Sequence, residues 1–131
     1  GGGGQSKESN IISPDDKHNF TLLMAEFRKQ LDAQGKIDGK HYFLTAAISG
    51  RQENIDNTEP ARYSKSLDWI NVMTYDFHGP WDKTTNFHDA LYADPHDPAT
   101  GVERSYNTDS AIQHLISLGV PRNKLLVGIG F

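Results

Sequence analysis

A tyrosine and an aspartate, Tyr75 and Asp76, follow a short apolar segment that runs from residue 69 to 72. The segment is apolar or β-prone at every position, which predicts a strand buried on both faces. A Gly-Pro pair at 79–80 breaks the backbone beyond it. A phenol and a carboxylate at the C-terminal end of a buried parallel strand stand where α/β enzymes hold their reacting groups. The same pattern also fits a strand end that enters solvent and carries no chemistry.

The elements that position this strand are predicted from the spacing of apolar residues. A helix over residues 14–34 has Ser13 as its N-cap and Gly35 as its C-terminal cap. Its apolar face consists of Phe20, Leu23, Met24, Phe27 and Leu31. The other predicted elements are a strand at 41–48, a polar loop at 51–57, a helix at 58–67, a long loop at 76–104, a helix at 107–118 and a strand at 125–131. This alternation predicts a parallel α/β sheet of three strands.

Length and composition exclude several classes of protein. The chain has 131 residues and a net charge of −4, with scattered basic residues that offer no electrostatic footprint for nucleic acid. No apolar run approaches the roughly 20 residues that span a bilayer, so we expect no membrane partner. There is no cysteine, which rules out disulfides and thiolate sites. Residues 1–12 are glycine-rich and polar, and we expect a flexible loop there rather than a signal peptide.

Other constellations of residues predict no second kind of site. The four glycines at 1–4 lack the lysine of a phosphate-binding loop, and Gly128 and Gly130 form only a weak fragment of a dinucleotide fingerprint. The histidines and aspartates at 88–97 match no standard spacing of metal ligands. No serine stands in the Gly-x-Ser-x-Gly turn of an α/β-hydrolase. We therefore expect neither a metal nor a cofactor.

The motif Met73-Thr74-Tyr75-Asp76, within residues 68–77 and followed by Gly79 and Trp81, resembles the sixth strand of a family 18 glycoside hydrolase, the bacterial type of chitinase. Further matches to this family are residues 15–35 to the helix after the fourth strand, 44–49 to the fifth strand, 87–92 with Asp97-Pro98 to the loop after the sixth, and 119–131 to the seventh strand. The resemblance implies a (β/α)8 TIM barrel, of which residues 13–131 supply an incomplete part from about helix 4 to strand 7.

The resemblance also implies a substrate-assisted, retaining hydrolysis of β-1,4-linked N-acetylglucosamine polymers. By the family's pattern Tyr75 donates its hydroxyl to the acetamido oxygen of the sugar, and Asp76 hydrogen-bonds the sugar and biases the ionisation of the nearby acid. Met73 forms part of the floor beneath the acetamido group. Trp81 is a candidate platform for a sugar ring, although ordinary packing of the loop explains it equally well. We expect Trp69 in the core.

One part of the family's pattern is absent from residues 1–131, namely the Asp-x-x-Asp-x-Asp-x-Glu motif whose glutamate donates the proton. We therefore expect a fragment, inactive alone, of a secreted and monomeric chitinase that acts on chitin or chitooligosaccharides. The alternative is a lectin-like protein on the same barrel that binds chitin or chitooligosaccharides without hydrolysing them. The pairing of Tyr75 with Asp76 favours the enzyme, because a lectin has no use for a clamp tuned to a transition state.

Overall fold

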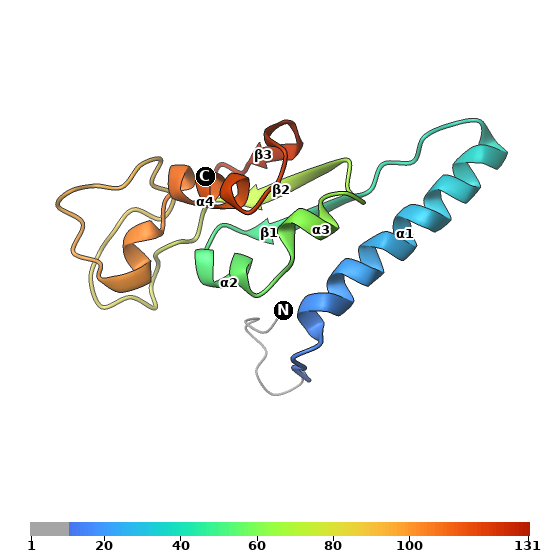
Figure 1. Ribbon diagram of the computed structural model, residues 1–131. Coiled ribbons are helices and arrows are strands. Elements are labelled where there is room, and N and C mark those ends of the chain that lie inside the picture. Colours follow the sequence, from blue (N-terminus) through green and yellow to red (C-terminus); the bar gives the residue numbers. More distant parts are fainter. Residues whose placement is uncertain (1–10) are drawn as a thin grey trace.

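The computed structural model describes residues 11–131 and contains a three-stranded parallel sheet (Figure 1). The strands are β1 (Thr45–Ser49), β2 (Trp69–Met73) and β3 (Leu125–Val127), in the order β1-β2-β3. The helices are α1 (Asp16–Asp38), α2 (Gln52–Asp56), α3 (Pro60–Tyr63) and α4 (Thr108–Ser117), with 3-10 turns η1 (Gly101–Ser105) and η2 (Arg122–Lys124). The predicted alternation and the parallel pairing are confirmed. Most of the predicted flexible loop at 1–12 lies outside the described residues.

The helices cover one face of the sheet. Ile70 and Val72 of β2 are fully buried on that face, among side chains from all four α-helices. The members of this core are Met24, Ile55, Tyr63, Leu67, Ile70, Val72, Leu115 and Val120. Each fully buried side chain of this size contributes about 1.5–3 kcal/mol to stability.

The other face of the sheet stays in contact with solvent in the described structure. Trp69 and Asn71 are only half-buried there, and Met73 is 36% exposed. The prediction of a strand buried on both faces, with Trp69 in the core, is therefore wrong for this structure. The reason is that side chains alternate along a strand, and the described helices pack on only one side of these three strands.

Helix α1 is longer than predicted and ends at a different glycine. It continues through Gly35 to Asp38, and Gly39 ends it in the left-handed conformation with φ 66°. The Gly39 and Lys40 amides both donate to the Gly35 carbonyl, the latter over 3.0 Å. Gly35 has a packing role instead, because a Cβ there would lie 2.4 Å from the Lys40 carbonyl oxygen. The C-terminal half of α1 extends beyond the sheet, which leaves Phe27 45% exposed despite its predicted place in the core (Figure 1).

The other differences from prediction lie at the ends of elements. Ser13 opens the turn before α1 by accepting from the Asp15 amide at 3.2 Å, and Asp15 itself is the N-cap. Residues 41–44 are not part of β1, since the Leu44 amide donates a hydrogen bond to the Asp68 carboxylate at 2.7 Å rather than to a neighbouring strand. The predicted loop at 51–57 contains α2, and β3 ends four residues earlier than residue 131. No helix among the described residues is long and apolar enough to cross a membrane.

Candidate active site at the carboxyl end of strand β2

The carboxyl ends of three parallel strands meet at one edge of the sheet, next to the long loop between β2 and α4 (Figure 1). Two hydrogen bonds keep β2 and β3 together past their ends. The Gly128 amide donates to the Val72 carbonyl at 2.8 Å, and the buried Thr74 hydroxyl donates to the Gly128 carbonyl at 2.7 Å. The residue after Thr74 therefore starts from a fixed backbone.

Tyr75 is half-buried, and its ring lies on the backbone that follows β3. A Cβ at Gly128 would lie 2.8 Å from its Cε1 atom, and a Cβ at Gly130 would lie 3.0 Å from its Cβ. The imidazole of His88 occupies the same place over Gly130, where its Nε2 would be 2.5 Å from an added Cβ. Of the two glycines that form a weak dinucleotide fingerprint in the sequence, Gly128 thus seats the Tyr75 ring, and Gly130 leaves room for the Tyr75 Cβ and the His88 imidazole.

Asp76 adopts the left-handed backbone conformation, with φ 53°, and is the only non-glycine residue to do so in the described part of the chain. Such a conformation costs about 1–3 kcal/mol, although aspartate tolerates it better than most residues. Asp76 is exposed, whereas the next residue, Phe77, is 1% exposed and donates its amide to the His88 carbonyl at 2.9 Å. The chain therefore turns back into the protein directly after the aspartate.

Three residues that the sequence did not indicate surround this turn. The Arg51 guanidinium donates from Nη2 to the carbonyl oxygens of Asp76 at 2.8 Å and of Phe77 at 3.1 Å. It lies over the Tyr106 ring, 5.0 Å from the ring centroid, and the Tyr106 hydroxyl donates to Glu53. Burial, together with the Glu53 carboxylate, raises the pKa of Tyr106 to about 12, so its phenol stays neutral. These contacts join segments that are far apart in the sequence, and no local pattern predicts them.

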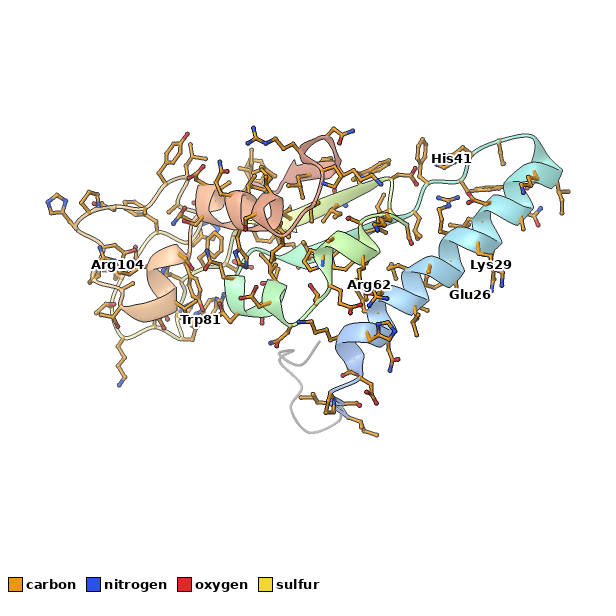
Figure 2. All side chains as sticks on the ribbon, in the orientation of Figure 1. Glu26, Lys29, His41, Arg62, Trp81 and Arg104 are labelled. Atoms are coloured by element: carbon orange, nitrogen blue, oxygen red, sulfur yellow. The ribbon has the colours of Figure 1, made fainter. Side chains whose placement is uncertain are left out.

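Met73 and Trp81, the remaining predicted site residues, differ in how they lie relative to Tyr75. Met73 precedes the pair on β2 and is partly exposed at the same edge. The Trp81 indole is 59% exposed and lies in the long loop after β2 (Figure 2). It folds against Gly79, where it lines a hollow with His78 and Glu103. The structure thus places Met73, Tyr75 and Asp76 in one continuous stretch and Trp81 beside a separate hollow.

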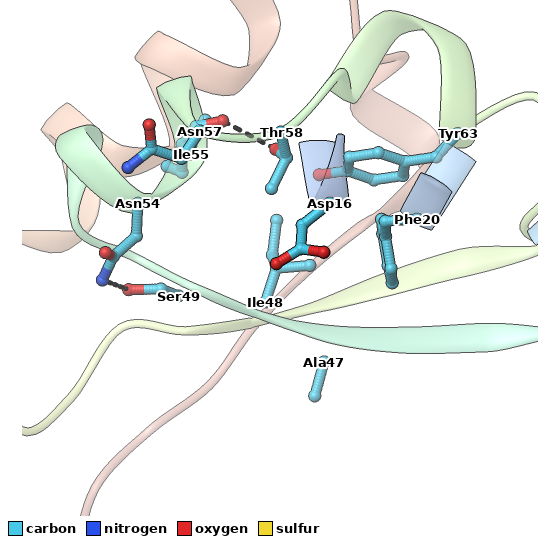
Figure 3. A pocket seen from close by; sticks show the side chains of 10 residues that line it. All are labelled: Asp16, Phe20, Ala47, Ile48, Ser49, Asn54, Ile55, Asn57, Thr58 and Tyr63. Atoms are coloured by element: carbon cyan, nitrogen blue, oxygen red, sulfur yellow. Dashed lines mark hydrogen bonds between the residues drawn. The ribbon is translucent and has the colours of Figure 1, made fainter. Parts of the chain in front are cut away.

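A cavity of about 300 Å³ lies away from these residues, between α1, β1 and the short helices (Figure 3). Phe20, Ile48 and Tyr63 supply much of its lining, and Asp16 is its one carboxylate. None of the four predicted site residues lines it. With a single carboxylate and none of the predicted site residues in its lining, it is a gap in the packing of α1 rather than a site for hydrolysis.

A parallel β/α sheet with polar side chains gathered at the carboxyl ends of its strands places the chain in the α/β class of folds. The model of the family described as Glycosyl hydrolases family 18 matches residues 3–131, and the chain belongs to this family. The predicted family is therefore confirmed, and the sheet corresponds to an incomplete TIM barrel.

Similar proteins include several chitinases. Chitinase A1 of Niallia circulans is 40% identical over 126 residues, which cover 95% of this chain and 18% of the relative. The structure of chitinase ChiA74 from Bacillus thuringiensis superimposes with a TM-score of 0.88 at 45% identity, covering 93% of this chain and 19% of that one. Catalytic domain 2 of the Ostrinia furnacalis Group II chitinase, solved in complex with penta-N-acetylchitooctaose, has a TM-score of 0.76 at 35% identity and covers 89% and 28% of the two chains. The chain thus spans less than a third of each of these relatives.

Proposed function

We propose that the protein containing this chain is a chitinase that hydrolyses β-1,4-linked N-acetylglucosamine polymers with retention and substrate assistance. Membership of family 18 and the chitinase names of its relatives support the class of enzyme. The observation that carries the proposal is the placement of Tyr75 and Asp76 on a fixed turn at the carboxyl end of β2. A substrate at this edge meets a phenol and a carboxylate side by side.

In the proposed reaction the acetamido oxygen of the sugar forms a bond to its own anomeric carbon as the glycosidic bond breaks. The leaving oxygen takes its proton from a glutamic acid of the family motif, which residues 1–131 do not contain. Water then attacks the anomeric carbon, breaks its bond to the acetamido oxygen and gives a proton to the glutamate left by the first step, so two inversions give net retention. The residues of this chain act by positioning the acetamido group and by stabilising developing charge.

Tyr75 is suited to hold the acetamido oxygen. Its ring is fixed against Gly128, and no described residue makes a hydrogen bond to its hydroxyl, which is therefore available to the substrate. A donor held in place before the reaction is worth about 10²–10³ in kcat, because it need not reorganise in the transition state.

Asp76 is suited to contact the sugar and the proton donor. Its backbone carbonyl is occupied by Arg51, whereas none of the described residues hydrogen-bonds its exposed carboxylate. Met73 forms part of the floor under the acetamido group in this proposal. Trp81 offers an exposed indole face, against which the apolar face of a pyranose ring can pack.

The test uses the full-length protein with chitopentaose as substrate. Hydrolysis followed by NMR should show the β-anomer as the first product, and an initial α-anomer would rule out the retaining mechanism. Tyr75→Phe should lower kcat by about 10²-fold with a smaller change in KM. Tyr42→Phe is the matched control, since this tyrosine precedes β1 at the amino end of the sheet and bonds Asp38 at 2.7 Å. A Tyr75→Phe enzyme with kcat within about twofold of the wild type would contradict the clamp.

A second candidate is a protein on the same barrel that binds chitin or chitooligosaccharides without hydrolysing them. What supports it is the similarity of the chain to YKL-39, solved in the presence of chitooligosaccharides, with a TM-score of 0.81 at 28% identity. If calorimetry shows that the full-length protein binds chitopentaose and an activity assay shows no turnover, this second candidate is supported over the chitinase. Secretion and a monomeric state are further predictions, which gel filtration and fractionation of the culture test.

A further inference from the structure

Arg51 occupies a fixed place between β1 and α2. It is the N-cap residue of α2, and its amide donates to the Ser49 hydroxyl at 3.1 Å. Its carbonyl accepts from the amides of Asn54 and Ile55, each at 3.1 Å. The backbone from which the guanidinium reaches the active-site turn is therefore held at both sides.

The guanidinium contacts select one conformation of the chain after Tyr75. A single nitrogen of Arg51 donates to the consecutive carbonyl oxygens of Asp76 and Phe77. Successive carbonyls of an extended strand point in opposite directions, so one donor reaches both only when the chain is turned. Arg51 thus stabilises the turned segment, with its left-handed aspartate, against an extended alternative.

Tyr106 holds the guanidinium in this position. The Tyr106 ring faces the Arg51 guanidinium. It also lies nearly parallel to the Phe77 ring, with the two ring centroids 5.9 Å apart. Its hydroxyl donates to Glu53, two residues along from Arg51. Because the phenol stays neutral, it remains a donor to Glu53 throughout the working pH range. The arginine is therefore held by its cation–π contact with the Tyr106 ring, which Glu53 and Phe77 keep in place.

We propose that Arg51 is a positioning residue that keeps Asp76 in its left-handed conformation and so sets the direction of its carboxylate. This inference rests on the proposed chitinase function. Arg51 is not a member of the buried core, so its loss should disturb the turn more than the fold. The residue does not touch the reacting atoms; it acts through Asp76.

The experiment measures kcat and KM of the full-length protein on chitopentaose. Arg51→Ala should lower kcat by about 10-fold or more, with KM changed less than about threefold, because the carboxylate is displaced rather than removed. Arg51→Lys, which keeps the charge but not the planar guanidinium, should fall in between. Arg62→Ala is the matched control: this arginine forms an ion pair with Glu59 at 2.9 Å in the helix layer and should leave kcat unchanged.

A double-mutant cycle separates positioning from a general structural role. In an Asp76→Ala background the Arg51→Ala change should have no further effect on kcat, because the carboxylate that it positions is gone. An equal loss in both backgrounds, or wild-type kcat for Arg51→Ala, would refute the proposal. If Arg51→Ala does not fold, Arg51→Lys completes the same cycle. If the wild type binds chitopentaose without turnover, only the proposed enzymatic function is refuted. The same double-mutant cycle is then measured as chitopentaose affinity by calorimetry.

Discussion

Replacing Gly128 by alanine tests whether the backbone after β3 positions Tyr75. The added Cβ would lie 2.7 Å from the Val72 carbonyl oxygen and 2.8 Å from Cε1 of Tyr75. The carbonyl belongs to β2 and accepts the Gly128 amide, so the backbone after β3 must shift away from this oxygen as well as from the tyrosine ring. To reach an ordinary carbon–carbon separation the ring and this backbone must move apart by about 0.7 Å or more.

A displacement of this size should affect kcat more strongly than it affects the free energy of unfolding. Overpacking at one site costs about 1–3 kcal/mol, which lowers Tm by several degrees. A misplacement approaching 1 Å of a group that contacts the substrate costs about 10²-fold in kcat. We therefore expect Gly128→Ala to lose about 10- to 100-fold in kcat on chitopentaose while it remains folded.

Gly101→Ala is the matched control for destabilisation. Gly101 has φ 60°, and nothing lies within 4 Å of an added Cβ, so the change introduces backbone strain of about 1–2 kcal/mol without contacting Tyr75. Calorimetry gives Tm for both variants, and a chitopentaose assay gives kcat. If Gly128→Ala loses stability like the control but keeps kcat within about twofold, the glycine does not position the tyrosine. If Gly128→Ala and Tyr75→Phe have additive effects on kcat, the two residues act independently and the reasoning is also refuted.

Three further predictions concern other parts of the structure. Asn107→Ala should lower stability by about 0.5–2 kcal/mol, because the Asn107 side chain accepts the Ser110 amide at the start of α4; unchanged calorimetric stability would contradict this. The raised pKa of Tyr106, about 12, means that the fold favours the neutral phenol, so this stabilisation is complete below pH about 10 and is lost as the pH rises towards 12. An absorbance titration should therefore lose a tyrosine step near pH 12 in Tyr106→Phe and keep it in the exposed-site control Tyr92→Phe. Residues 1–131 expressed alone should not turn over chitotriose, and any turnover would show that another group donates the proton.

The order of elements could be predicted because it depends on local patterns. Apolar runs and helical spacing indicate strands and helices without knowledge of their partners. The ends of these elements depend on tertiary contacts, so the sequence predicts them less accurately. Both Gly35 and Gly39 satisfy the rule for a helix end, but the approach of the Lys40 carbonyl gives Gly35 a packing role and leaves the cap to Gly39. The sequence offers no sign of which glycine a backbone will approach.

The site could be predicted only where its residues are consecutive. Met73, Tyr75 and Asp76 follow one apolar segment, so a single strand brings them to the edge of the sheet. Arg51 reaches the same turn from the loop predicted at 51–57, and Tyr106 reaches it from between the predicted loop at 76–104 and the helix at 107–118. Their interactions are set by three-dimensional packing. A left-handed conformation at Asp76 is also hidden in the sequence, since aspartate occurs in many conformations.

The left-handed turn has a physical reason that follows from the alternation of β2. Val72 and Thr74 point to the helix-covered face and are buried, so an extended chain would place Asp76 on that face as well. Burying an ionised carboxylate without a partner costs several kcal/mol, more than the roughly 1–3 kcal/mol of the left-handed backbone. The turn instead exposes Asp76 and directs Phe77 into the protein. The smaller strain thus keeps the carboxylate beside Tyr75 and accessible to a substrate, which is why a contact that stabilises the turn bears on catalysis.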